Sequence, residues 1–337
     1  MKKENDSAPT TETEITAADR RDLTDNTEQA ADPEETDTDT ETNAETDTNT
    51  ETNADADADN ADADSSEFYE QLPDPEPTAD TNVQPDEAAS LAAEKQKPVI
   101  TIRGIRKAFG EHEVLRGVDL HVNQGENLVI LGKSGTGKSV LIKCLVGLEW
   151  PDDGTIDIYG QDISKLNYGE MNALRLKVGF LFQNAALYDS MTVRENLAFP
   201  LRQHMKKMPK EKKDELIMEM LDNVGLADSI DQLPSKLSGG QNKRVGLART
   251  LVLRPEIMLY DEPTTGLDTG TAKEISELIC QMKRKYNMSS ITITHDMACA
   301  RMTADRIIMM KDGIVYAEGS YADLEGSDDE FIRTFFS

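Results

Sequence analysis

Three short motifs in a fixed order constrain the fold of this chain more than any other feature. The first spans residues 132–139, reads GKSGTGKS and fits the phosphate-loop pattern G-x-x-x-x-G-K-[ST]. The second is LSGGQ at residues 237–241, and the third is YDE at residues 260–262. The first motif alone predicts only that a nucleoside triphosphate binds, so the finer interpretation depends on the other two.

The residues around the first motif supply the structural context that it requires. The apolar run 127–131 predicts a buried strand that leads directly into the glycine loop. After the loop, Val140, Leu141, Cys144 and Leu145 recur at helical spacing, so the loop is expected to begin a helix. A strand, a glycine loop and a helix in this order form the phosphate-binding unit.

Apolar runs of strand length alternate with helical stretches along the rest of the chain. We expect strands at 99–102, 114–122, 155–159, 178–181, 257–260, 290–294, 306–310 and 314–317, and helices within 190–231 and at 242–253, 271–285 and 296–302. This alternation predicts an α/β fold with a mainly parallel sheet that is covered on both faces. Because only one phosphate loop and one LSGGQ are present, each chain holds one catalytic unit.

The acidic charge is concentrated at the N-terminal end. The whole chain has a net charge of −28; residues 1–97 hold 30 acidic and 6 basic side chains, and the remaining 240 residues hold 34 and 30. A segment so poor in apolar residues cannot offset its ordering entropy, so residues 1–97 are expected to be a disordered, low-complexity tail. The alternatives are an acidic arm for a basic partner and a short docking motif within residues 68–77.

Two further features of the composition bear on compartment and membrane contact. The three cysteines, Cys144, Cys280 and Cys299, share no metal-ligand spacing and are expected to be small buried apolar residues. Lys2 and Lys3 are followed by no apolar run, so no signal peptide is expected. No run approaches the roughly 18 apolar residues of a membrane span, so a membrane role would require a partner.

The LSGGQ motif, placed between the phosphate loop and YDE, resembles the signature of ATP-binding-cassette (ABC) ATPases. The resemblance covers about residues 99–320. It implies a P-loop NTPase cassette with a RecA-like core, an antiparallel β-subdomain and a helical subdomain at about 190–245. The implied organisation is the tail at 1–97, the ATPase domain at 98–326 and a short C-terminal extension at 327–337. In this family two copies close head-to-tail over two ATP molecules, which implies a homodimer.

The motifs assign roles to individual side chains. Backbone N–H groups of the phosphate loop would surround the β- and γ-phosphates, with Lys138 as the cation and Ser139 as a Mg²⁺ ligand. By resemblance, Asp261 would hold Mg²⁺ through its water shell, Glu262 would polarise the attacking water, and His295 would contact the γ-phosphate.

The same resemblance implies the remaining contacts. Gln183 would sense Mg²⁺ and nucleotide state, Phe109 would stack on adenine where the family more often has Tyr, and Ser238–Gly240 would bind the γ-phosphate of ATP held by the opposite subunit. The expected catalytic residues are Glu262, His295, Lys138 and Gln183. The expected ATP contacts are Phe109, Gly132, Lys133, Ser134, Gly135, Thr136, Gly137, Lys138, Ser139, Val140, Ser238, Gly239, Gly240, Gln241 and Asp268. The expected metal ligands are Ser139, Gln183 and Asp261.

Two segments narrow the resemblance. Residues 182–202 and 327–336 are similar to the ATPases of Mla/Mce-type phospholipid transport systems, although that family does not generally carry an acidic tail. The resemblance implies a separate integral permease and an Mce-domain lipid-binding protein. It also implies a location on the cytoplasmic face of a bacterial inner membrane, and phospholipid movement between inner and outer membrane. The alternatives are another importer or lipoprotein-extracting cassette, or a soluble cassette ATPase. No nucleic-acid partner is expected beside so acidic a tail.

Overall fold

The computed structural model describes residues 97–336. The tail expected at residues 1–97, except for Lys97, and the docking motif expected within 68–77 therefore lie outside the described residues. The expectation of disorder for the tail stays a prediction from composition.

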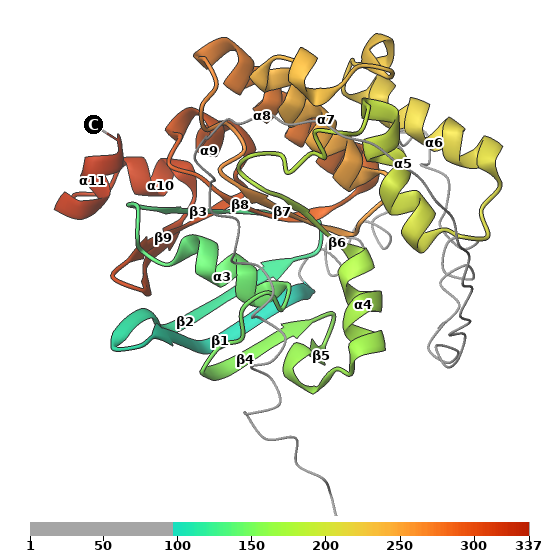
Figure 1. The fold of residues 1–337 in the computed structure, drawn as a ribbon. Helices are drawn as coiled ribbons and strands as arrows, with labels where there is room; N and C mark the ends of the chain where they lie inside the picture. Colours follow the sequence, from blue (N-terminus) through green and yellow to red (C-terminus); the bar gives the residue numbers. More distant parts are fainter. Residues whose placement is uncertain (1–96, 337) are drawn as a thin grey trace, which may run out of the picture. The chain divides into compact units, whose positions relative to one another are not determined.

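A six-stranded, mainly parallel sheet forms the centre of the described part (Figure 1). Its order is β10-β9-β3-β8-β7-β6. The strands are β3 (Asn127–Gly132), β6 (Val178–Leu181), β7 (Ile257–Asp261), β8 (Ser289–Ile293), β9 (Arg306–Lys311) and β10 (Ile314–Gly319). The pairs β3·β8, β3·β9, β6·β7 and β7·β8 are parallel, and β10 pairs antiparallel with β9. The predicted parallel sheet is thus confirmed.

Alternate residues of these strands enter different cores, because successive side chains on a strand point to opposite faces. Leu128 and Ile130 of β3 join one apolar cluster, which also contains residues of α3 (Lys138–Leu145). Val129 and Leu131 join a second cluster with Ile332 of α11 (Glu330–Phe336). The predicted cover on both faces of the sheet is confirmed, and the segment 327–336 contributes to the core of one face.

A second, antiparallel sheet lies beside α3 in Figure 1, with the order β2-β1-β4-β5. Its strands are β1 (Pro98–Phe109), β2 (His112–Asn123), β4 (Asp153–Ile158) and β5 (Gln161–Asp162). The first strand is longer than the expected 99–102 because Gly104, at φ 60°, interrupts its apolar pattern without ending it. The Gly104 N–H donates to Asp119 Oδ1 at 2.9 Å, which holds this irregular position to β2.

Helices α5, α6 and α7 form a third group, and they share an apolar cluster with α8 and with residues of β6 and β7. The remaining helices are α4 (Tyr168–Lys177), α5 (Val193–His204), α6 (Lys210–Asn223), α7 (Gly239–Leu251), α8 (Thr269–Tyr286), α9 (Met297–Thr303) and α10 (Tyr321–Glu325), with short turns η1 (Ile163–Lys165), η2 (Ala227–Ser229) and η3 (Pro234–Lys236). Ser238 caps α7, accepting from the Gln241 N–H, so part of LSGGQ is also a helix start. The sequence pattern does not predict α4, α10 or α11. The subdomain boundary expected at about 245 falls inside α7.

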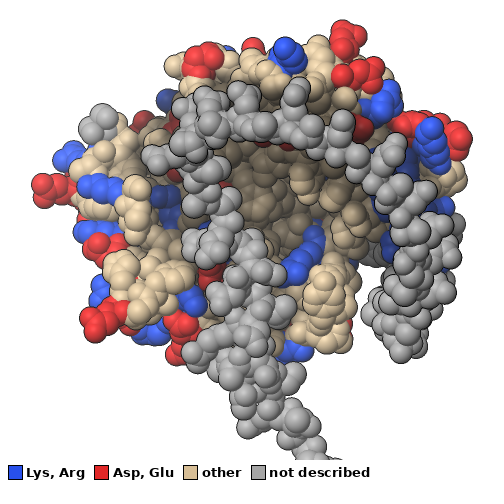
Figure 2. Space-filling view, viewed as in Figure 1, with Lys and Arg blue, Asp and Glu red and all other residues tan. Residues whose placement is uncertain are grey.

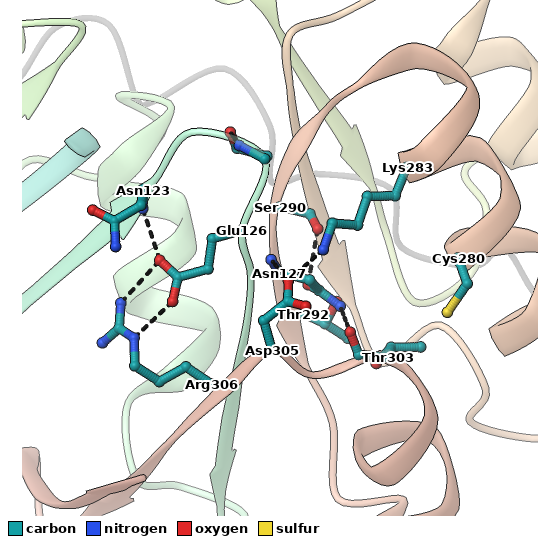
Figure 3. Close-up of polar contacts among 12 residues, drawn as sticks. Asn123, Glu126, Asn127, Cys280, Lys283, Ser290, Thr292, Thr303, Asp305 and Arg306 are labelled. Carbon is teal, nitrogen blue, oxygen red and sulfur yellow. Dashed lines mark hydrogen bonds and ion pairs between the residues drawn. The ribbon is translucent and has the colours of Figure 1, made fainter. Parts of the chain in front are cut away.

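A buried polar network ties the beginnings of the central strands together (Figure 3). Asn127 is 1% exposed, and its side chain donates to Thr303 O at 2.7 Å. The same side chain accepts from Ser290 Oγ at 2.8 Å and Thr292 Oγ1 at 3.1 Å, and the Asn127 N–H donates to Asp305 Oδ2 at 2.7 Å. These bonds connect β3 to β8 and to the segment before β9, so a slipped register would leave buried polar groups without partners.

Among residues 97–336, no helix combines the length and the apolar character that crossing a membrane requires.

Candidate nucleotide-binding site

The phosphate loop lines a cavity of about 930 Å³ at the end of β3. The other lining residues come from β1, β2, the turn after β6, the ends of β7 and β8, and α11. The lining residues are Phe109, His112, Val114, Gly132, Lys133, Ser134, Gly135, Gly137, Lys138, Ser139, Val140, Gln183, Glu262, His295, Thr334 and Phe335. Most of the residues that the motifs predicted as one site are therefore brought together.

Local geometry explains why this loop can surround an anion. Gly135 and Gly137 have φ of 82° and 94°, a region that side chains with a Cβ rarely adopt. A Cβ at Gly132 would lie 2.8 Å from Met310 O, so a larger residue would push the loop away from β9. Gly137 is also the N-cap of α3, whose positive end therefore faces the loop.

Lys138 is the buried cation of the cavity. Its side chain is 8% exposed, and its ammonium donates to Gly132 O at 2.7 Å and Lys133 O at 3.0 Å. Burial lowers the pKa of Lys138, and the nearby Glu262 and Asp261 carboxylates oppose that shift. The ammonium is thus held against the loop that is expected to bind the phosphates of ATP.

Ser139 and Asp261 meet across the site from α3 and β7. Ser139 Oγ donates to Asp261 Oδ1 at 3.3 Å, although the two residues are 122 positions apart. Burial raises the pKa of Asp261, and the Ser139 hydrogen bond opposes that shift. A hydroxyl and a carboxylate are the hard oxygen ligands that Mg²⁺ prefers, so this donor pair fits the predicted metal. Gln183, the third expected ligand, lines the cavity together with Ser139. Within the described residues no group of three or more His, Cys, Asp and Glu forms a metal cluster.

Glu262 and His295 form a close pair at the ends of the neighbouring strands β7 and β8. His295 Nδ1 lies 2.8 Å from Glu262 Oε2, and Thr265 Oγ1 donates to the same oxygen at 3.0 Å. The backbone of Glu262 has φ 49°, an uncommon conformation for a non-glycine residue, and its N–H donates to Ile293 O at 2.9 Å. Strained backbone of this kind concentrates at functional sites, where surrounding contacts hold it in place.

Phe109 stands at the rim of the cavity. It is 47% exposed, at the end of β1, with the Lys107 ammonium 5.3 Å from the ring centroid. An exposed ring at the mouth of a phosphate-binding cavity can present its face to a base.

The signature residues lie elsewhere. Ser238, Gly239, Gly240 and Gln241 begin α7 and do not line the cavity, and neither does Asp268. Asp268 caps α8 by accepting from the Thr271 N–H at 3.0 Å, and a Cβ on Gly240 would lie 2.3 Å from Thr271 Cγ2. The structure therefore packs the signature and Asp268 segments against each other, away from the chain's own phosphate loop.

Several residues at the site were not predicted from sequence motifs. His112, Val114, Thr334 and Phe335 line the cavity but carry no motif. Lys243 is a clearer omission: it is 6% exposed and donates to the carbonyl oxygens of Gln183 and Glu262, the second at 3.3 Å. The sequence offered one signal for Lys243: a lysine on the buried face of a predicted helix needs acceptors inside the protein.

Comparison with known proteins agrees with this geometry. The family model described as "ABC transporter" matches residues 115–265. The methionine import ATP-binding protein MetN of Brucella abortus (strain 2308) is 39% identical over 222 residues, 66% of this chain and 60% of that protein. The chain thus spans about 60% of that relative's length. The probable ribonucleotide transport ATP-binding protein mkl of Mycobacterium leprae is 38% identical over 252 residues, 74% of this chain and 72% of the relative.

Solved structures show the same likeness. A dimeric ATP-binding cassette in a post-hydrolysis state, bound to ADP and Pi, superposes with a TM-score of 0.61 at 32% identity. The match covers 66% of this chain and 98% of that one. The cbiO1 protein of Clostridium perfringens, part of the ABC transporter complex cbiONQ, gives a TM-score of 0.64 at 27% identity. That match covers 71% of this chain and 94% of the cbiO1 chain. The chain therefore belongs to the ABC transporter family and carries the ATPase domain of that family.

Proposed function

We propose that this chain is the ATP-hydrolysing subunit of a transporter whose membrane-spanning permease is a separate polypeptide. The Glu262–His295 pair carries the proposal, because a carboxylate held by two donors in the phosphate-loop cavity is placed to orient a water. A protein that only held a nucleotide would not need this pair.

Each residue of the cavity has a role in the proposed reaction. Phe109 stacks on the base, and the phosphate loop and Lys138 neutralise phosphate charge. Ser139 and Asp261, with Gln183, would hold Mg²⁺, which would supply positive charge to offset the negative charge of the phosphates. Glu262 accepts a hydrogen bond from the attacking water, and His295 keeps that carboxylate oriented while contacting the γ-phosphate.

A second copy of the chain completes each site in this proposal. Ser238–Gly240 and Asp268 lie outside the chain's own cavity, at helix starts whose N–H groups can receive a phosphate from another subunit. The solved cassette bound to ADP and Pi is dimeric, which supports a homodimer for this chain. Hydrolysis then depends on closure of the homodimer, which links the chemical step to movement of the subunits.

A groove beside the turn after β6, which carries Gln183, supplies the docking site for the permease. It encloses about 200 Å³ and is lined by Arg175, Leu176, Val178, Gly179, Phe180, Phe182, Ala185, Ala186, Pro200, Gly246, Arg249, Thr250, Leu253 and Pro255. Phe182 lines it at 39% exposure, and Tyr188, also 39% exposed, stacks over Arg249 at its edge, with 4.8 Å between the guanidinium and the ring centroid. Exposed rings around a small groove suit one face of an amphipathic permease helix.

The proposed cargo is a phospholipid, carried with the help of an Mce-domain protein at the cytoplasmic face of a bacterial inner membrane. The likeness of residues 182–202 and 327–336 to Mla/Mce-type ATPases supports this cargo. Methionine is the second candidate, because the MetN relatives carry that name. Nucleic acid is not among the proposed partners. On the face shown in Figure 2, the visible acidic and basic side chains of residues 97–336 are interspersed.

Two substitutions test the hydrolysis proposal. Lys138→Ala removes the buried cation and should abolish nucleotide binding. Glu262→Gln should retain ATP binding, slow hydrolysis on the order of a hundredfold or more, and accumulate closed dimers with ATP. ATP affinity, ATP turnover and molecular mass in the presence of ATP are measured for both variants and for the wild type. Normal turnover in Glu262→Gln would refute the proposed chemistry.

A double variant tests the coupling to transport. Met191 adjoins Tyr188, since its N–H donates to Tyr188 O at 3.1 Å. Tyr188→Asp together with Met191→Asp should leave ATP binding intact and weaken co-purification with the proposed permease. In cells, the same variant should cause detergent sensitivity if phospholipid is the cargo. If methionine is the cargo, it should prevent a strain that cannot synthesise methionine from growing on a low external concentration of it. A variant that assembles normally would refute the docking site.

A further inference from the structure

The turn after β6, which carries Gln183, is held by one stripe of α7. Lys243, Gly246 and Arg249 stand three residues apart on that helix, so they share a face. The Lys243 ammonium donates to Gln183 O, a Cβ on Gly246 would lie 2.8 Å from Ala185 Cβ, and the Arg249 guanidinium donates to Ala186 O. Three successive residues of the α7 stripe therefore contact the turn.

The held backbone is strained. Ala185 and Ala186 have φ of 58° and 48°, and Glu262, the other residue whose carbonyl accepts from Lys243, has φ 49°. Non-glycine residues in this region persist only where neighbouring contacts fix them. Lys243 contacts both of these turns, through Gln183 O and Glu262 O.

The chemistry of Lys243 suits this position. A lysine ammonium offers three donors, and at 6% exposure few of them can be satisfied by water. Burial lowers the pKa of Lys243, while the Glu262 and Asp261 carboxylates oppose the shift. Bonds from a charged donor to carbonyl oxygens are stronger than neutral ones, and removal of the donor leaves those oxygens without it.

We propose that Lys243 is a positioning residue that fixes the main chain of Gln183 and of Glu262 to the signature helix α7. In this way one side chain joins the signature segment, the turn that carries the predicted metal ligand and the turn that carries the predicted base. The consequence for catalysis rests on the proposed roles of Gln183 and Glu262, whereas the structural link does not.

The test compares variants of the full chain. Lys243→Met keeps the length and volume of the side chain without a donor, Lys243→Arg keeps a cation, and Lys165→Met is the control, since Lys165 is 81% exposed in η1. Hydrogen exchange is measured without nucleotide at peptides that cover residues 181–187 and 261–266. Lys243→Met should speed exchange there by about ten- to hundredfold, from the loss of a charged hydrogen bond. Exchange in β3 should not change, Lys243→Arg should restore protection, and the control should match the wild type.

Kinetics add a second readout. Lys243→Met should lower kcat at least about tenfold and change the ATP dissociation constant by less than about threefold, because the phosphate loop is untouched. If Lys243→Met does not fold, Lys243→Gln, which keeps a donor without charge, is compared with Lys243→Arg. The proposal would be overturned if hydrogen exchange in both turns of Lys243→Met stayed at the wild-type rate. Equal loss of protection in the neutral variants and in Lys243→Arg would also overturn it. Normal hydrolysis by Glu262→Gln together with faster exchange in Lys243→Met would refute the proposed chemistry alone.

Discussion

Replacement of Asn127 by Leu gives a stringent test of the polar network that sets the register of the central sheet. The two side chains have similar volume, so the change removes hydrogen bonds without opening a large cavity. Three side-chain bonds are lost, to Thr303 O, Ser290 Oγ and Thr292 Oγ1. Each buried partner left unsatisfied costs about 1–3 kcal/mol, and partial rearrangement of the two hydroxyls reduces the sum, so we expect destabilisation by about 3–6 kcal/mol. That is a large part of a typical domain stability of about 5–15 kcal/mol.

The assay is urea unfolding of the nucleotide-free chain, followed by circular dichroism. Ser290→Ala alone and in combination with Asn127→Leu completes a double-mutant cycle. The coupling energy should be on the order of 1 kcal/mol or more, because the hydrogen bond between Ser290 Oγ and Asn127 is absent from both single variants. ATP affinity of the folded protein should not change, since Asn127 begins β3 and the phosphate loop follows its other end. A destabilisation below about 1 kcal/mol, or additive single variants, would refute the reasoning.

Three further predictions concern the site and the thiols. Phe109→Ala should weaken ATP binding by about 5- to 100-fold, as for the loss of one stacked base, while Phe109→Tyr should retain it; titration with a fluorescent ATP analogue checks both. Gly240→Ala should impair hydrolysis more than ATP binding by the single chain, because the new Cβ lies 2.3 Å from Thr271 Cγ2 and displaces the start of α7; equal loss of both would count against it. Burial raises the pKa of Cys144 to about 12 and that of Cys299 to about 11, so less than about 1% of either is thiolate at pH 8. Iodoacetamide should therefore label both only after unfolding, as read by peptide mass, and labelling of either in the folded chain would contradict the burial.

The sequence alone was sufficient for the parts of the site that are local or lie at predictable strand ends. Residues 132–140 are contiguous, so the strand, glycine loop and helix follow from the pattern itself. Glu262 and His295 each follow an apolar strand, and parallel neighbouring strands bring their carboxyl ends to one edge; the 2.8 Å contact between them agrees with that expectation.

Tertiary structure decided the remaining features of the fold and the site, because these features depend on contacts between residues that are far apart in sequence. The length of β1 depends on cross-strand pairing through an irregular position at Gly104, which hydropathy along one strand does not encode. The contribution of α11 to the cavity depends on how Ile332 packs against the central sheet. Lys243 has an ordinary polar identity in sequence; its acceptors are 60 and 19 residues away, and only the packing of α7 against two turns makes its buried charge a link between them.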